Sequence, residues 1–300
     1  MSAPAPAPGR TRLAALKTYK LYIGGKFPRS ESGRYLTARS PTTGEHLANF
    51  SHASRKDFRD AVVAARKAQP GWGACSAYLK GQILYRMAEM LESRSDSFVA
   101  ELQSSTGTDK SSARKEVAAS IDRIIYYAGW SDKFQQVFGS VNPVAGPHFN
   151  FSTLEPTGVV GIFCPDSPAL LGLVSLLVPA IVGGNSTVVL ASQKFPLPAI
   201  SLAEAIATSD VPAGVINLLS GERAELAPHF STHMDVNAIV DGSGDPSSAD
   251  ILRQGPASNL KRVSLRAAAA SADWFDAAAN DPYRILDTLE TKTTWHPIGV

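Results

Sequence analysis

The sequence predicts an α/β protein built on a doubly wound parallel sheet, with helices and a β-hairpin ahead of the sheet. Between residues 159 and 265, short apolar runs typical of buried strands alternate with helical segments. Such alternation indicates parallel βαβ units with helices on both faces of the sheet. Residues 54–130 instead carry apolar side chains at helical spacing only. Residues 137–155 have the apolar residues and Gly/Pro punctuation of a hairpin, and an alternating segment closes the chain.

Composition is that of an ordinary globular protein, with 300 residues, 44% hydrophobic and 19% charged. This length suffices for one large domain or two of average size. The net charge is only +2, without a long run of Lys or Arg, so we expect neither nucleic acid nor an anionic membrane as partner. The most apolar stretch, 170–182, is shorter than the roughly 20 residues of a membrane helix.

The cellular compartment is predicted from the cysteines and the first residues. The two cysteines, Cys75 and Cys164, cannot form a disulfide framework, which suggests a reducing compartment. The opening MSAPAPAPGR lacks the apolar core of a signal peptide. We therefore expect a cytoplasmic protein.

The first half of the chain is predicted to be a mobile arm followed by helices. Residues 1–16 are rich in Ala and Pro and read as a disordered arm. Order is expected from Leu21, where LYIGGKF turns at Gly24 and Gly25. Ser54 can cap the first helix, and Pro70 is expected to end it. The expected helices are 54–70, 83–107 with a break near Ser95, and 112–130.

The second half is predicted to supply the parallel sheet. The segments expected are strand 159–163, helix 168–182, strand 186–190, helix 197–209, strand 214–219, helix 224–231, strand 237–240, helix 247–254 and strand 262–265. The pattern collapses after Leu265 into an alanine-rich stretch without a strand. The final strand is expected at about 289–296.

Several blocks in this region resemble one enzyme family. LEPTGVVGIFCP, PAIVGGNSTVVL, VPAGVINLLSG, DVNAIVDGSG and LKRVSL follow one another between Leu154 and Leu265. Together with RDAVVAARKAQPGW and YYAGWSDKF upstream and LETKTTW near the end, they resemble the NAD(P)-dependent aldehyde dehydrogenase superfamily. The resemblance covers roughly residues 20–265 and 283–297. It implies a Rossmann-like dinucleotide-binding domain, a separate α/β domain with a nucleophilic cysteine, and a β arm that joins subunits.

The resemblance also implies that the catalytic domain is missing. The family places its cysteine well after the position of Leu265, and this chain has no cysteine beyond Cys164. The stretch between Arg266 and Tyr283 is far shorter than the ~100 residues of a compact domain. We expect a family-like N-terminal domain over 17–265 with an oligomerisation hairpin at 137–155, then a linker and a terminal strand. The linker, 266–282, would replace the catalytic domain, and 283–300 would hold the oligomerisation strand.

The residues that the catalytic chemistry of the family requires are replaced in this sequence. Aldehyde oxidation by this route needs a thiolate, oxyanion donors and a general base. Arg266 stands where the family has its general-base Glu. Ser167 stands at the oxyanion Asn, with Asp166 beside it to repel an oxyanion. Cys164, with no basic residue adjoining it, reads as a small buried hydrophobe. We assign no catalytic residue and expect no enzyme activity from this chain alone.

Dinucleotide binding is predicted to be lost or vestigial. The family's Lys-Pro-Ser-Glu segment, which holds the adenosine ribose, is Ala191-Ser-Gln-Lys194 here. Its Thr-Gly-Ser turn survives in part, so Gly242 and Ser243 are the candidate cofactor-binding residues. Asp241 and Asp245 place negative charge close to any phosphate. We expect no cofactor, and NAD(P) held by this turn is the alternative.

A metal site is not expected. The six histidines show no paired ligand spacing, and His229 and His233 lie four apart without an acidic or cysteine partner at ligand spacing. We therefore place these two side chains at the surface.

Three functions remain open at this point. The first is a non-catalytic structural or regulatory subunit, paired through 137–155 and 289–296 with a full-length aldehyde dehydrogenase or with a second copy. The second is an NAD(P)-dependent aldehyde oxidoreductase that is active only with a partner. The third is a vestigial nucleotide-binding module. Retention of an alternating terminal strand favours the first, because an unpaired strand edge promotes aggregation.

Overall fold

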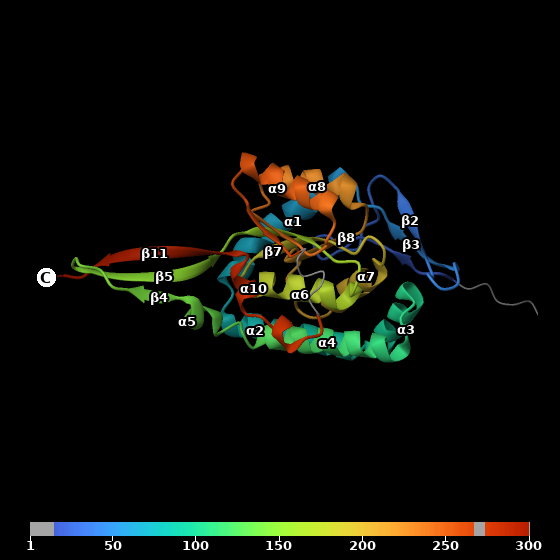
Figure 1. The fold of residues 1–300 in the computed structure, drawn as a ribbon, viewed down its shortest axis with the longest axis horizontal. Helices are drawn as coiled ribbons and strands as arrows, with labels where there is room; N and C mark the ends of the chain where they lie inside the picture. Colours follow the sequence, from blue (N-terminus) through green and yellow to red (C-terminus); the bar gives the residue numbers. More distant parts are fainter. Residues whose placement is uncertain (1–14, 267–273, 300) are drawn as a thin grey trace, which may run out of the picture.

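The computed structural model describes residues 15–266 and 274–299 (Figure 1). Most of the arm expected at 1–16 lies outside these residues. A small sheet of order β1-β3-β2 comes first, with β1 at Thr18–Tyr19, β2 at Tyr35–Arg39 and β3 at His46–Ser51. The predicted turn is present, since Ile23 pairs with Lys26 around Gly24 and Gly25. Both glycines have positive φ, 57° and 76°, which favours glycine at these positions.

The first helix is longer than its sequence predicts. α1 spans Arg55–Ala74 and begins as expected, because Ser54 and Asp57 form a capping box. The prediction that it ends at Pro70 is wrong, since the helix continues through Pro70 for another turn. Trp72 in that turn is 1% exposed, and its Nε1 donates to the Ile181 carbonyl at 2.8 Å. This buried contact stabilises the last turn and outweighs the backbone hydrogen bond that proline cannot make.

Three further helices form a layer beyond the sheet. They are α2 at Ala77–Glu92, α3 at Ser95–Thr106 and α4 at Lys110–Ala128. The break expected near Ser95 lies between α2 and α3. α3 ends at Gly107, whose φ of 76° makes a left-handed cap. The apolar stripes of these helices face inward, as their spacing predicts.

The main sheet has five parallel strands in the order β10-β9-β6-β7-β8. The strands are β6 at Val159–Phe163, β7 at Ser186–Leu190, β8 at Ile216–Leu219, β9 at Ala238–Asp241 and β10 at Arg262–Leu265. The connecting helices are α6 at Ala169–Val182, α7 at Leu197–Ile206, α8 at Arg223–Thr232 and α9 at Pro246–Gln254, followed by a 3₁₀ turn at Gly255–Ser258. This arrangement confirms the predicted doubly wound fold.

Helices cover both faces of this sheet (Figure 1). α1, α8 and α9 lie on one face, and α6 and α7 lie on the other, with α2 to α4 outside them. Every residue of α6 is buried, which accounts for the apolar run at 170–182. Within the described parts of the chain, no helix combines the length and the apolar character that crossing a membrane requires.

The arm is a three-stranded antiparallel sheet of order β11-β5-β4 that extends away from the body (Figure 1). β4 is Ser140–Asn142, β5 is His148–Pro156 and β11 is Leu289–Pro297. The hairpin predicted at 137–155 is shorter at its start, because a helical turn, α5 at Phe134–Phe138, precedes it. β11 pairs with the whole of β5, from Leu289 opposite Pro156 to Pro297 opposite His148.

The segment expected to be a linker packs against the body where it is described. Trp274 is 7% exposed, and its carbonyl accepts from Nη2 of Arg123 on α4 at 2.9 Å. The carbonyl of Asp281 accepts from the Tyr127 hydroxyl, also on α4, at 2.9 Å. A 3₁₀ turn at Ala277–Ala279 and α10 at Tyr283–Leu286 then lead into β11. The alanine-rich composition gave no sign of this packing, and 267–273 lie outside the described residues.

One buried amide fastens the base of the arm to the main sheet. Asn185 is fully buried just before β7. Its Oδ1 accepts from the Gly158 amide at 2.9 Å, next to the start of β6. Its Nδ2 donates to the Thr288 carbonyl at 3.0 Å, next to the start of β11. The Asn185 side chain thus adds to the backbone connections that hold the arm to the sheet.

Candidate functional site

The carboxyl ends of the parallel strands are the first place to look for a site, because open α/β sheets bind ligands in the crevice at this edge. Three loops meet there in this chain. They follow β6, where Cys164 and Asp166 lie, β7, where residues 191–194 lie, and β9, where Gly242 and Ser243 lie. The structure therefore places the candidate cofactor-binding turn at this edge.

In the turn after β9, nearby backbone amides donate hydrogen bonds to two aspartates of the turn itself. The Ser243 amide donates to Oδ1 of Asp241 at 2.8 Å. Asp245 caps α9 and accepts from the amides of Ser247 at 3.2 Å and Ser248 at 3.3 Å. Hydrogen bonds from the Ser248 and Ser247 hydroxyls and amides lower the pKa of Asp245, although partial burial opposes them. The helix N-terminus that would meet a phosphate is thus occupied by a carboxylate.

Asp241 adds a second acidic group at this edge. Its side chain is fully buried, and its Oδ2 has no hydrogen-bond partner among the described residues. Burial raises the pKa of Asp241. Gly242 beside it approaches α6 closely, since a Cβ on Gly242 would lie 2.6 Å from Leu176. The turn therefore has little space around its backbone.

Asp166 joins the loop after β6 to the loop after β7 by hydrogen bonds and to the start of α8 by a partly buried ion pair. Asp166 Oδ1 accepts from Nη2 of Arg223 at 2.8 Å, and Oδ2 accepts from its Nη1 at 3.3 Å. The same Oδ1 accepts from the Ser192 hydroxyl at 2.9 Å and from the amides of Gln193 and Lys194 at 3.0 and 3.2 Å. Burial alone would raise the pKa of Asp166, but the hydrogen bonds and charge of Arg223 outweigh it and lower the pKa.

The expectation that Asp166 projects its charge toward an oxyanion is therefore wrong. Arg223, the first residue of α8, neutralises it, and sequence reasoning missed this arginine. The Arg223 amide also donates to Oε1 of Gln193 at 3.0 Å, so α8 and the loop after β7 are locked together. The available signal was a cation at the helix start directly after β8, at the carboxyl edge where ligands bind.

Cys164 is buried beside this pair. Its side chain is 0% exposed, and its carbonyl accepts from Nη2 of Arg223 at 2.9 Å. The expectation that no basic residue adjoins it is wrong, but burial outweighs the arginine and raises the pKa of the Cys164 thiol. The thiol is therefore protonated and enclosed, which is the opposite of an activated nucleophile.

Thiol labelling tests this assignment. In the native protein we expect Cys75, which is partly exposed, to react with a disulfide reagent such as DTNB while Cys164 stays unreactive. Denaturant should release the second thiol. Rapid modification of Cys164 in the folded wild type, compared with Cys75→Ser as reference, would show that the thiol is accessible and would reopen its assignment.

Arg266 and Ser167 stand at the other two positions to which the resemblance assigns catalytic roles. Arg266 pairs with Asp287 just before β11, so it fastens the end of β10 to the arm. Ser167 is exposed, and the helix behind it is capped from elsewhere. Glu116 of α4, which is buried, accepts from the amides of Leu170 at 2.7 Å and Leu171 at 3.2 Å in the first turn of α6. Neither position offers a general base or a free oxyanion donor in this arrangement.

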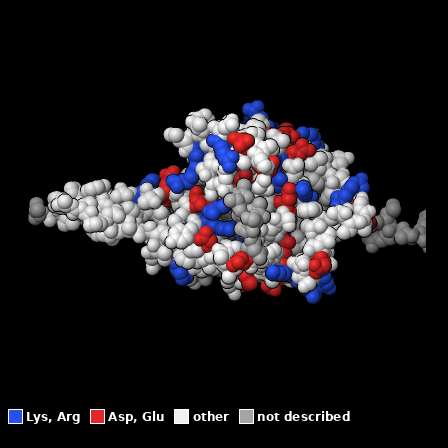
Figure 2. All heavy atoms as spheres, viewed as in Figure 1, with Lys and Arg blue, Asp and Glu red and all other residues white. Residues whose placement is uncertain are grey.

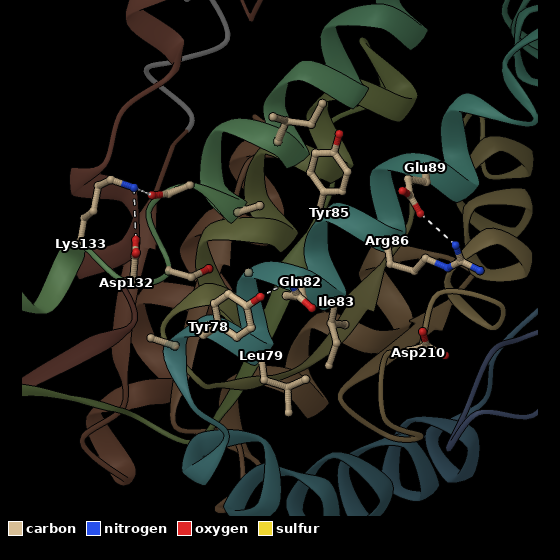
Figure 3. Close-up of a pocket in the computed structure, with 16 residues that line it drawn as sticks. Tyr78, Leu79, Gln82, Ile83, Tyr85, Arg86, Glu89, Asp132, Lys133 and Asp210 are labelled. Carbon is tan, nitrogen blue, oxygen red and sulfur yellow. Dashed lines mark hydrogen bonds and ion pairs between the residues drawn. The ribbon is translucent and has the colours of Figure 1, made fainter.

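A separate groove of about 1020 Å³ lies over α2 and the end of α4 (Figure 3). Its polar side chains pair with one another, as Lys133 does with Asp132, Arg86 with Glu89, and Gln82 with Tyr78. The exposed apolar side chains beside them are Tyr78, Leu79, Tyr85 and Ile125. Its lining also includes Lys133, directly before α5, and Asp210, before β8. The groove therefore lies apart from the three loops at the carboxyl edge of the sheet.

The two spaced histidines do not form a metal centre in the structure. His229 stacks on Phe58 with ring centroids 6.5 Å apart, and His233 meets the same ring edge-on at 5.6 Å. Both are partly buried rather than fully at the surface, and burial lowers the pKa of each. Among the described residues, no group of three or more His, Cys, Asp or Glu side chains is placed to hold a metal ion.

The parallel sheet, with helices on both faces, and the β arm define a Rossmann-like α/β protein. The family model of the aldehyde dehydrogenase family matches residues 27–286. The chain belongs to the aldehyde dehydrogenase family.

Known relatives cover this chain over most of its length. Omega-crystallin of Enteroctopus dofleini is 29% identical over 264 residues, which are 87% of this chain and 52% of that protein. Aldehyde dehydrogenase, cytosolic 1, of Elephantulus edwardii is 32% identical over 252 residues, 82% of this chain and 49% of that protein. The chain thus spans about half the length of these relatives.

A solved structure matches the fold. It is an NAD⁺ complex of an aldehyde dehydrogenase from Bacillus cereus, with a TM-score of 0.79 at 24% sequence identity. The match covers 83% of this chain and 51% of that one. The similarity is therefore one of fold over the Rossmann-like half.

Proposed function

We propose that this chain is a non-catalytic member of the aldehyde dehydrogenase family, a structural or regulatory subunit of a mixed oligomer with a full-length aldehyde dehydrogenase. The catalytic positions support this reading. Cys164 is enclosed, Arg266 is paired with Asp287, and Ser167 faces solvent. The proposed setting is the cytoplasm, in line with two free cysteines.

The carboxyl edge does not fit a dinucleotide held by its pyrophosphate and ribose. The first amides of α9 are bonded to Asp245, and the loop after β7 is bonded to Asp166. A bound phosphate would have to displace a carboxylate at either place. We therefore include the absence of NAD(P) binding in the proposal.

The observation that carries the proposal is an exposed arm without charged side chains in its outer part. Residues 134–154 and 293–299 contain no Lys, Arg, Asp or Glu, and the projecting arm is correspondingly white in Figure 2. Large apolar side chains are exposed along it, including Phe149 at 45% and Trp295 at 59%. Soluble proteins usually protect long edge strands with charges. An uncharged, exposed edge is suited to a protein partner.

The free backbone groups of β11 can be identified from its pairing with β5. The Ile298 amide donates to the Pro147 carbonyl, and the Thr288 carbonyl accepts from the Thr157 amide. Because hydrogen-bonded pairs alternate in an antiparallel ladder, the N–H groups of Thr291, Thr293 and Trp295 point away from β5. They offer a ladder to a strand from another subunit.

Co-expression with a full-length aldehyde dehydrogenase, followed by native mass spectrometry, tests the proposal. We expect mixed oligomers with the wild-type chain. Thr291→Pro removes one outward N–H without breaking a bond to β5 and should weaken association about tenfold. Thr291→Ala, which keeps that N–H, is the matched control and should assemble like the wild type.

Other outcomes separate the alternatives. A chain that stays monomeric with every such partner, or a Thr291→Pro variant that assembles as well as Thr291→Ala, contradicts the proposal. Self-association alone points to the second-copy version of the same subunit. Saturable binding of NAD⁺ or NADP⁺ to the isolated chain favours the nucleotide-binding module. Turnover of aldehydes that persists in Cys164→Ala would show an enzyme of another mechanism.

A further inference from the structure

The donors around Asp166 have the composition of an oxyanion site. A hydroxyl from Ser192, two backbone amides from Gln193 and Lys194, and the Arg223 guanidinium all bond to one carboxylate. Amides at the start of a turn, together with a guanidinium, are what proteins use to bind carboxylates and phosphates. Here the anion is supplied by the chain itself, from the loop after the neighbouring strand.

A second observation is that Arg223 has a donor nitrogen that makes no hydrogen bond among the described residues. Arg223 is only 7% exposed, and its Nε has no hydrogen-bond partner among the described residues. The Asp166 side chain is 22% exposed and the Arg223 side chain 8%, so the carboxylate lies nearer to solvent than the guanidinium that it contacts. An anion that replaced the Asp166 carboxylate could enter from solvent and would contact the buried Arg223 guanidinium.

The charged residues around these four donors determine which class of anion they can bind. Asp241, on the adjacent strand β9, is fully buried and lies within electrostatic reach of Arg223. A bound dianion would therefore be repelled by the Asp241 carboxylate. A planar monoanion of the size of the removed group, a small carboxylate, suits the donors best.

We propose that Asp166 is a built-in occupant of a carboxylate-binding site formed by Ser192, the amides of Gln193 and Lys194, and Arg223. The site takes an external small carboxylate once the Asp166 carboxylate is removed. In the wild type the site is closed by its own chain at the edge where the fold family binds its cofactor. This inference does not depend on the arm or on any partner.

Rescue of Asp166→Ala by formate is the test, because formate matches the removed carboxylate in shape and charge. The variant is expected to unfold more readily than the wild type, since it leaves the buried Arg223 guanidinium without its carboxylate. Sodium formate should raise its Tm above that in sodium chloride of the same concentration. The apparent Kd for formate should be at least about tenfold lower than in the wild type.

Two variants serve as controls. Asp166→Ala combined with Arg223→Met lacks the cation and should show no formate-specific gain. Asp109→Ala removes an exposed carboxylate that caps α4 through the Ser111 and Ser112 amides without an arginine, and it should also show none. If Asp166→Ala does not fold in chloride, refolding in formate should recover native protein. Equal behaviour in formate and chloride, or a wild type that binds formate as tightly as the variant, would overturn the proposal.

Discussion

Replacing Arg223 with alanine is expected to lower the free energy of unfolding by about 3 kcal/mol. The substitution leaves the Asp166 carboxylate, whose side chain is 22% exposed, without its cation, and a largely buried charge without a partner is costly. It also removes the donor to the Cys164 carbonyl and opens space at the carboxyl edge. Urea denaturation monitored by tryptophan fluorescence would measure the loss.

An exposed ion pair provides the control for this substitution. Arg86 pairs with Glu89 on the surface of α2, where both side chains are about half exposed. Arg86→Ala should therefore change the free energy of unfolding by no more than about 0.5 kcal/mol. Equal effects of the two substitutions would mean that the Arg223 pair is no stronger than a surface pair.

The loss in Arg223→Ala is expected to depend on pH with a definite sign. The pKa of Asp166 is lowered in the folded state, so its ionised form stabilises the fold above the unfolded pKa of about 3.9. This stabilisation disappears as the pH falls through the lowered pKa. The gap between wild type and Arg223→Ala should therefore be full near pH 7 and narrow below about pH 4. A gap that widens with acid would contradict the assignment.

Replacing Asn185 with alanine should also cost about 3 kcal/mol. The change leaves the Gly158 amide buried without an acceptor and removes the donor to the carbonyls of Thr288 and Ala180. Because these groups begin β6 and β11 and end α6, the loss should loosen the base of the arm. Hydrogen exchange of the amides in 289–297 should accelerate more than exchange in the main sheet.

Asn49→Ala is the matched control for that measurement. Asn49 is partly exposed in the small sheet, where its Oδ1 meets Thr37 and His46 side chains. We expect a cost below about 1 kcal/mol and no change in exchange of the arm. If Asn185→Ala accelerates exchange evenly across the whole protein, Asn185 stabilises the fold in general and has no special role at the arm.

Most of the fold could be predicted because its signals are local. The strands β6, β7 and β10 lie at the predicted residues, since short apolar runs between polar turns leave little choice of boundary. The capping box at Ser54 is likewise a short-range pattern. Where tertiary contacts compete with local ones the prediction failed, as at Pro70, where burial of Trp72 extends α1.

The candidate site was less predictable because it depends on pairing across the chain. Gly242 and Ser243 lie at the carboxyl edge, but their surroundings depend on the hydrogen bonds that Asp241 and Asp245 accept from the Ser243 and Ser247 amides. The partner of Asp166 comes from another βα unit, and no spacing rule connects the two positions. A residue read as a repulsive charge in the sequence is therefore neutralised in the fold.

The order in which β5 and β11 are made has a consequence for folding. During synthesis β5 emerges first, and most of the Rossmann-like domain is made before β11 follows to pair with it. Through that interval one side of β5 has an open hydrogen-bonding edge, and such edges are where nascent chains misassemble or exchange strands. Until β11 is made, a strand from another chain can therefore pair with β5 in its place.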